Sequence, residues 1–110
     1  MAAKTPFDQA KELSNQLIRI LSQLDVDVLP RDEQRLVATI KRQLEDVRLD
    51  ARDYDFAETR AEQQRNASVA KESLEKLRAN ILKASEFNLF GAVDVAMASA
   101  HIEQLISNLE

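Results

Sequence analysis

The chain has 110 residues, of which 45% are hydrophobic and 31% charged, and its formal net charge is −4. This length suits one domain with a modest core, and the hydrophobic content argues against a disordered chain. The absence of cysteine excludes a disulfide framework, a thiolate catalyst and a zinc–cysteine site. We therefore expect a single folded domain over residues 1–110.

The charge is spread unevenly along the chain. Residues 1–30 carry three basic and four acidic groups, residues 31–90 carry twelve of each, and residues 91–110 carry three acidic groups and no basic one. None of these segments has a basic excess, which argues against binding to nucleic acid and to anionic membranes. The N-terminal end lacks the apolar core of a secretory leader, and the most apolar stretch, 89–106, is too polar to span a membrane. We expect a cytoplasmic protein.

A strong start signal predicts a first helix over about 5–24. Thr5 can cap this helix, Pro6 suits its first position, and Asp8 lies in its first turn, near the positive end of the helix dipole. Apolar residues recur here at spacings of three and four, and they form one stripe: Ala10, Leu13, Leu17, Leu21 and Leu24. The segment 25–30 ends in proline and is the clearest linker in the chain.

Residues 31–90 contain neither glycine nor proline, and good helix formers dominate them. Two apolar seams with three-four spacing cross this segment. The first seam is Val37, Ile40, Leu44, Val47, Ala51 and Tyr54. The second seam is one residue out of phase and consists of Ala67, Ala70, Leu74, Leu77, Ile81 and Ala84.

The fault between the two seams allows three arrangements: one long helix over about 31–86, a turn near Asp53, or a turn near Asn66. We expect helices over about 31–52 and 55–86, the second of which a break near Asn66 would divide. A bundle is favoured over a rod, because a compact monomer buries both seams.

An internal likeness at an offset of 33 residues indicates an alternative fold. Residues 49–56 and 82–89 each follow the pattern Leu-x-Ala-x-acid-aromatic-Asp/Asn-apolar. A helical-hairpin repeat of this period would place turns at 52–56, 66–68 and 85–89. However, the offset is close to nine helical turns, so two amphipathic helices also align by chance.

The last helix is predicted over about 90–109, with Asn88 as a candidate cap. One apolar stripe consists of Val95, Ala98, Ile102, Leu105 and Leu109. A second stripe consists of Ala92, Ala96 and Ala100, and Val93 and Met97 extend it. A helix that is apolar on more than one side is central or contacts a second partner.

The expected fold is therefore all-α: an antiparallel bundle of about three to five helices with coiled-coil-like packing and no sheet. The helical-hairpin repeat and one long central helix are the alternatives.

Aromatic residues provide the strongest candidates for an interaction surface. Phe87, Leu89 and Phe90 lie between two predicted helices, where they either plug the end of the bundle or form an exposed anchor for a partner. Tyr54 and Phe56 lie in a polar stretch and allow the same two interpretations.

The surplus apolar surface of the last helix, including Met97, adds to these candidates. We therefore predict a non-catalytic interaction or scaffolding module without a cofactor. It would associate with itself in a homo-oligomer or bind a partner helix.

A second hypothesis is a small helical enzyme, or a metal or phosphoryl site, at His101, the only histidine. Asp94 and Glu103 are its acidic neighbours on the predicted helix. A metal site needs several convergent ligands, and the Glu-x-x-His spacing of metal-binding bundles is absent. An ordinary histidine on a helix surface is therefore favoured, and we predict no metal and no catalytic residue.

A third hypothesis is a nucleic-acid accessory protein that uses Arg31, Arg35, Lys41 and Arg42. The balanced charge of the surrounding segment argues against it. Further along, carboxylates and arginines alternate over residues 46–65, which is typical of a solvated helix face and not of a cation site.

Overall fold

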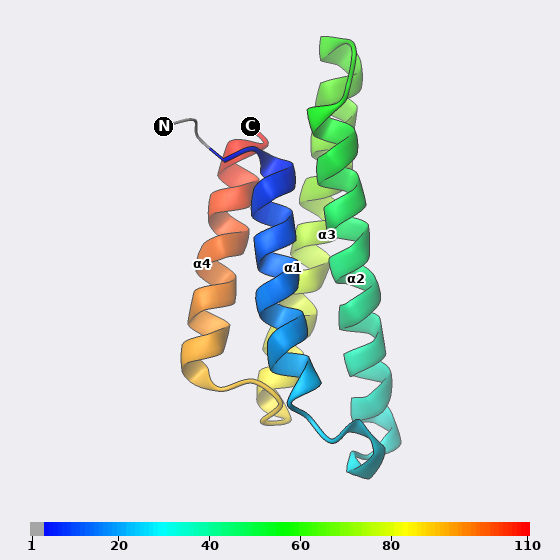
Figure 1. Cartoon of the computed structure of the whole chain (residues 1–110), viewed down its shortest axis with the longest axis vertical. Coiled ribbons are helices and arrows are strands. Elements are labelled where there is room, and N and C mark those ends of the chain that lie inside the picture. The colour runs from blue at the N-terminus through cyan, green and yellow to red at the C-terminus, as the bar shows by residue number, and fades with distance from the viewer. Residues whose placement is uncertain (1–3) are drawn as a thin grey trace.

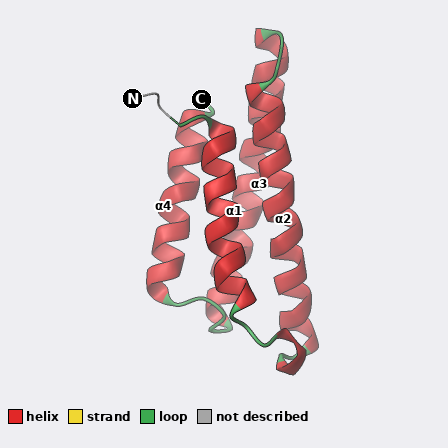
Figure 2. Cartoon of the chain, in the orientation of Figure 1, coloured by secondary structure: helices red, strands yellow, loops and turns green. Residues whose placement is uncertain are grey.

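The computed structural model of the protein describes residues 4–110. The described chain forms four α-helices: α1 (Pro6–Ser22), α2 (Arg31–Asp55), α3 (Arg60–Glu86) and α4 (Ala92–Asn108). One short 3-10 helix, η1 (Val26–Val28), lies between α1 and α2. The described residues contain no strand (Figure 2). Residues 1–3, part of the N-terminal end that was expected to lack a leader, lie outside the described residues.

Consecutive helices run antiparallel, and each helix packs against two others (Figure 1). Helix α1 packs on α2 and α4, and α3 packs on the same two helices from the other side. This arrangement confirms the prediction of an all-α helical bundle. None of the four helices combines the length and the apolar content needed to cross a bilayer.

One predicted apolar stripe from each of the four helices contributes to a single core. Its largest fully buried side chains come from all four helices: Leu13, Leu17, Leu21, Ile40, Leu44, Leu74, Leu77, Ile81, Ile102 and Leu105. Burying each such side chain stabilises the fold by roughly 1.5–3 kcal/mol. Three stripe residues, Leu24, Tyr54 and Val95, are only half-buried at the edge of this core.

The predicted start of α1 is confirmed. The Thr5 hydroxyl accepts a hydrogen bond from the Asp8 N–H at 3.2 Å, and the Asp8 carboxylate accepts one from the Thr5 N–H at 3.5 Å. Hydrogen bonding from the Thr5 side chain and backbone to the carboxylate, with a smaller contribution from Lys11, lowers the pKa of Asp8. The helix ends at Ser22, two residues earlier than predicted.

The turn between α2 and α3 lies at residues 56–59, so the prediction of a helix end at 52 and a start at 55 is wrong by several residues. The rod is wrong because this turn interrupts it. The break near Asn66 and the repeat are wrong because residues 66–68 lie inside α3. The apolar seam keeps α2 helical through Tyr54, and Thr59 caps α3 by accepting a hydrogen bond from the Glu62 N–H at 3.1 Å. The one-residue change of phase between the two apolar seams thus marks the boundary between two helices.

The connection between α3 and α4 depends on Asn88, whose φ of 61° lies in the left-handed region. The N–H groups of Asn88 and Leu89 donate to the carbonyls of Ser85 and Ala84, each at 3.0 Å, which closes the end of α3. The prediction that Asn88 caps the last helix is therefore wrong. Asn88 ends α3, and Gly91 occupies the N-cap position of α4.

The four helices differ in length, which shapes one end of the bundle. Helices α2 and α3 have 25 and 27 residues, whereas α1 and α4 have 17 each. At 1.5 Å per residue the first pair is longer by roughly 12–15 Å. The α2–α3 connection therefore projects beyond the start of α1 and the end of α4 (Figure 1).

Candidate functional site

A pair of aromatic rings lies where the end of α2 meets the first turn of α1. Phe56 follows the last residue of α2, and 71% of its surface is exposed. Its ring meets that of Phe7 edge to face, with 6.3 Å between the ring centroids and 67° between the planes. Rings prefer this geometry because the positive edge of one meets the negative face of the other. The pair forms a single apolar feature contributed by two helices.

A hydrogen bond between the two helices holds the rings together. The Phe7 N–H donates to the Asp55 carboxylate at 3.1 Å. This N–H belongs to the first turn of α1, where backbone donors lack helical partners and the helix dipole favours a negative charge. Lys11 completes the feature, with its Nζ 4.5 Å from the centre of the Phe7 ring. We call Phe7, Lys11, Asp55 and Phe56 the tip surface.

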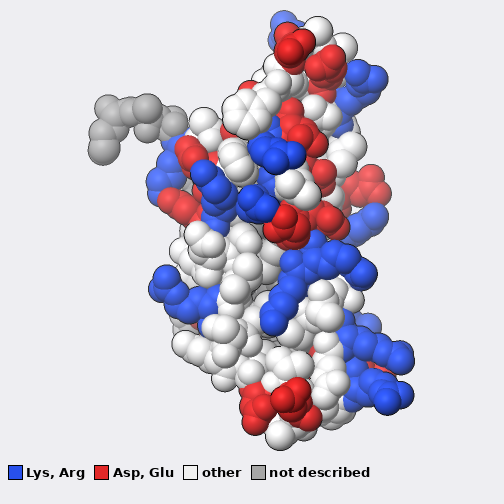
Figure 3. All heavy atoms as spheres, turned by 45° about the vertical axis from the view of Figure 1, so that its right-hand side comes forward, with Lys and Arg blue, Asp and Glu red and all other residues white. Residues whose placement is uncertain are grey.

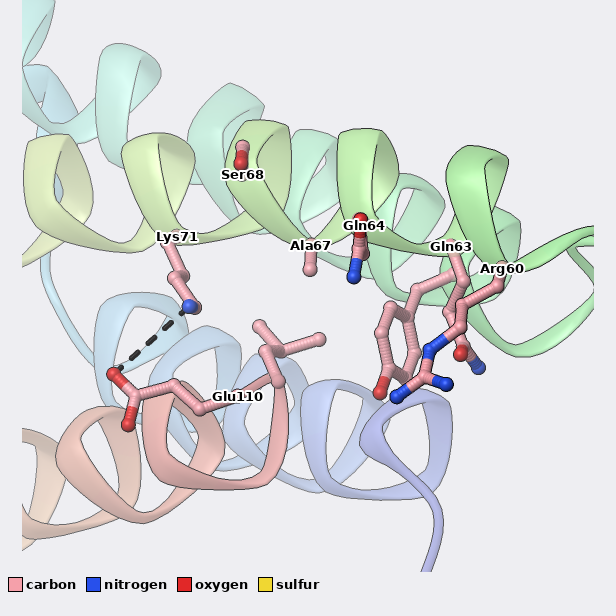
Figure 4. A pocket seen from close by; sticks show the side chains of 9 residues that line it. Arg60, Gln63, Gln64, Ala67, Ser68, Lys71 and Glu110 are labelled. Carbon is pink, nitrogen blue, oxygen red and sulfur yellow. Dashed lines mark ion pairs between the residues drawn. The ribbon is translucent and has the colours of Figure 1, made fainter.

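A hollow of about 320 Å³ lies on another side of the projecting end, between α3 and the last residues of the chain. Figure 4 shows Lys71 and Glu110 at one end of this hollow and Arg60 and Gln63 at the other. The Lys71 Nζ lies 3.9 Å from a Glu110 carboxylate oxygen, and Tyr54 forms part of the wall. The hollow thus offers mainly polar groups, whereas the tip surface offers aromatic ones.

The structure separates the six residues that were predicted as an interaction surface. Leu89 and Phe90 are only 7% and 4% exposed, so they plug the end of the bundle, and the exposed-anchor interpretation is wrong for both. Tyr54 is half-buried against the core. Phe87 is 41% exposed, but it follows the end of α3, at the opposite end of the bundle from Phe56.

Met97 is the sixth predicted residue, and it lies half-buried on α4. The second apolar stripe of this helix faces solvent: Ala92, Ala96 and Ala100 are exposed, and Val93 is 81% exposed. Helix α4 is therefore not central, because it packs only on α1 and α3.

Of the tip surface, only Phe56 was predicted as an interaction residue. Phe7 is the aromatic member that the sequence patterns missed. It lies outside the apolar stripe of α1, and the start signal of the helix had explained the residues around it. Phe7 lies three residues before Ala10, the first residue of that stripe, and this spacing is the local signal that its ring packs toward a neighbouring helix.

His101 is half-buried and lines a hollow between α1 and α4 together with Gln9, Glu12 and Gln104. Residues 4–110 contain no group of three or more histidine and carboxylate side chains that could hold a metal ion. Glu12 is the one acidic residue that lines this hollow with His101.

Arg31, Arg35, Lys41 and Arg42 all lie exposed on the first half of α2. Further along the same helix, carboxylates and arginines form exposed ion pairs. One joins Arg48 to Glu45, and the Arg48 guanidinium lowers the pKa of that carboxyl group. These pairs agree with a solvated helix face.

Comparisons of the chain with protein-family models, with curated proteins and with solved structures gave no match. The site is therefore interpreted from its own residues and geometry.

Proposed function

We propose that the protein is a non-catalytic interaction module that binds another protein through the tip surface. The observation that carries this proposal is the ring pair of Phe7 and Phe56, in which Phe56 is exposed and Phe7 is half-buried. Aromatic side chains contribute most of the binding energy in many interfaces, because they bury a large apolar area in a rigid shape.

The fixed geometry of the tip supports the same proposal. The Asp55 hydrogen bond joins the two helices that carry the rings, and the Thr59 cap orders the start of α3. Asn66 adds a third restraint, because its side-chain amide donates to the Asp53 carbonyl at 3.0 Å. A surface that is ordered before binding loses less conformational entropy in the complex.

The chemistry of the tip indicates the kind of partner. A helix with one apolar face could cover both rings, while a carboxylate beside that face could pair with Lys11. We place this interaction in the cytoplasm, because the chain has no cysteine and so cannot use the disulfides that stabilise many small extracellular domains.

Affinity capture with tip variants tests the proposal. Purified protein would be used to capture binding proteins from the native cell, and each would then be titrated against wild type and Phe56→Ala. We expect Phe56→Ala to lower the affinity for the partner by about tenfold or more, because the ring is the centre of the proposed contact.

Phe87→Ala is the matched control, because it removes another exposed ring that also follows a helix end. It should leave the affinity unchanged. A partner that loses affinity with Phe87→Ala but not with Phe56→Ala or Phe7→Ala would refute the tip as the binding surface.

A further inference from the structure

Helix α2 separates its charges along its length into two halves. Residues 31–42 carry four basic and two acidic groups, whereas residues 43–55 carry two basic and five acidic groups. Figure 3 brings the α2 side of the molecule forward and shows Lys and Arg gathered along its lower right edge, with Asp and Glu more frequent higher up. Helix α2 thus presents a cationic half and an anionic half on one surface.

Four charged residues define a line along this face: Arg35, Arg42, Asp46 and Asp53. All four are exposed, and they lie on the side of α2 opposite to its buried residues, such as Ile40. Their spacings of seven, four and seven residues keep them on one helical stripe. The line is symmetric about position 44, with two cations before it and two carboxylates after it.

This symmetry makes the line complementary to itself in one orientation. When a second α2 lies antiparallel, with a two-fold axis at position 44, Arg42 faces the partner's Asp46 and Arg35 faces the partner's Asp53. A two-fold axis repeats each contact, so the same register places four ion pairs across the axis. A parallel arrangement in this register would instead bring arginine against arginine and carboxylate against carboxylate.

The groups of this line are available for such contacts. The ion pairs among residues 4–110 do not involve Arg35, Arg42 or Asp46, and Asp53 lies 3.8 Å from an exposed neighbour, Arg52. No described helix covers the outer face, because α2 packs only on α1, α3 and η1.

We propose that two copies of the chain associate through antiparallel pairing of their α2 helices along this line. The inference is independent of the proposed function, because it uses a different surface from the ring pair. Exposed ion pairs are individually weak and are screened by salt, so the dimer is weak and depends strongly on ionic strength.

Sedimentation equilibrium of the full chain tests the proposal over protein concentrations from about 10 μM to about 1 mM. We expect wild type to dimerise at about 0.05 M salt, and its dissociation constant to rise by about tenfold or more at about 0.5 M salt. Arg42→Asp and Asp46→Arg should each weaken the dimer by about tenfold or more, because each places like charges across the axis.

Mixing these two variants gives the sharpest measurement. In a heterodimer, the chain with two carboxylates faces the chain with two arginines at both central positions, so the mixture should associate more tightly than either variant does alone. The double variant Arg42→Asp/Asp46→Arg should also regain the dimer, because both members of each pair are exchanged. Arg19→Asp, an equal charge change on the exposed side of α1, is the control and should not alter association.

Several outcomes would overturn the proposal. One is a wild-type protein that stays monomeric at low salt over the whole concentration range. Another is a mixture of the two variants that stays monomeric, or a dimer that survives Arg42→Asp but is lost in Val93→Lys, which would place the contact on the outer face of α4. Circular dichroism of each variant would verify that these exposed substitutions leave the helices intact.

Discussion

Phe56 and Phe90 each lie in a connection between two helices, yet one is 71% exposed and the other 4%. Phe56 directly follows α2, whereas Phe90 lies four residues past the end of α3 and directly before Gly91, the N-cap of α4. The Phe56 ring meets Phe7 in the first turn of α1 and otherwise lies at the surface, whereas Phe90 lies in the α3–α4 connection and is part of the buried core. The difference shows that a place in a connection between helices does not by itself determine whether an aromatic ring joins the core.

The largest expected effect tests this contrast directly. Phe90→Ala should lower the free energy of unfolding by about 3–4 kcal/mol, because it leaves a cavity in the packed end of the bundle. Phe56→Ala should lower it by about 1 kcal/mol or less, since only the contact with Phe7 is lost. Urea denaturation of both variants measures the two values, and equal losses would contradict the assignment of a plugged end and an exposed end.

A smaller effect concerns the backbone of the plugged end. Asn88→Ala should lower the free energy of unfolding by about 1 kcal/mol, because alanine tolerates the left-handed conformation of this position poorly. Asn88→Gly should not destabilise the protein, since glycine adopts that conformation freely. If thermal or urea denaturation showed the reverse order, the left-handed end of α3 would be wrong.

At the exposed end, Asp55→Ala should lower the free energy of unfolding by about 0.5–1 kcal/mol, because the first turn of α1 loses its acceptor. Hydrogen exchange of the Phe7 amide should become faster in this variant. Asp53→Ala, which removes an equal charge close by, should leave that exchange rate unchanged. Faster exchange in both variants would mean that charge alone, without the hydrogen bond, protects the amide.

The smallest effects concern pH. Hydrogen bonds from Thr5 lower the pKa of Asp8 below its ordinary value of 3.8, and hydrogen bonds from Arg78 lower that of Glu75 below 4.5. Because these carboxyl groups bind protons more weakly when folded, their stabilising contribution is complete above the ordinary values and is lost as the pH falls through the lowered ones.

Urea denaturation from pH 7 down to acid pH measures this loss. In Glu75→Gln, the free energy of unfolding should fall slightly less steeply at acid pH, because one of the perturbed groups no longer titrates. Asp8→Asn should do the same at the exposed end. If both variants lost the same unfolding free energy at acid pH as wild type, these surface contacts would not contribute to stability.

The helical periodicity predicted much of the fold. Leu17, Ile40, Leu77 and Ile102 lie on separate predicted stripes, and all four are fully buried. This success has a physical reason: a stripe at three-four spacing is a property of one helix, and burying it requires only that other helices are present. The start of α1 was predicted for the same kind of local reason, because Thr5 and Asp8 bond to each other.

The candidate site was less predictable. Phe56 was proposed from sequence, but Phe7 was not, since the two lie far apart in the chain and meet only where α1 begins beside the end of α2. The turn at 56–59 did carry a local signal, namely Thr59 followed three residues later by Glu62. The continuous run of helix-forming residues around this signal concealed it.

The sequence by itself determined the helical class, the buried stripes and the charge pattern of α2, because each depends on residues a few positions apart. The tertiary structure alone decided which aromatic residues are buried and which are exposed, and which face of α4 lies in solvent. Those outcomes depend on the relative lengths and levels of helices from distant parts of the chain. Phe56 meets Phe7 only because the tertiary structure places the end of α2 beside the first turn of α1.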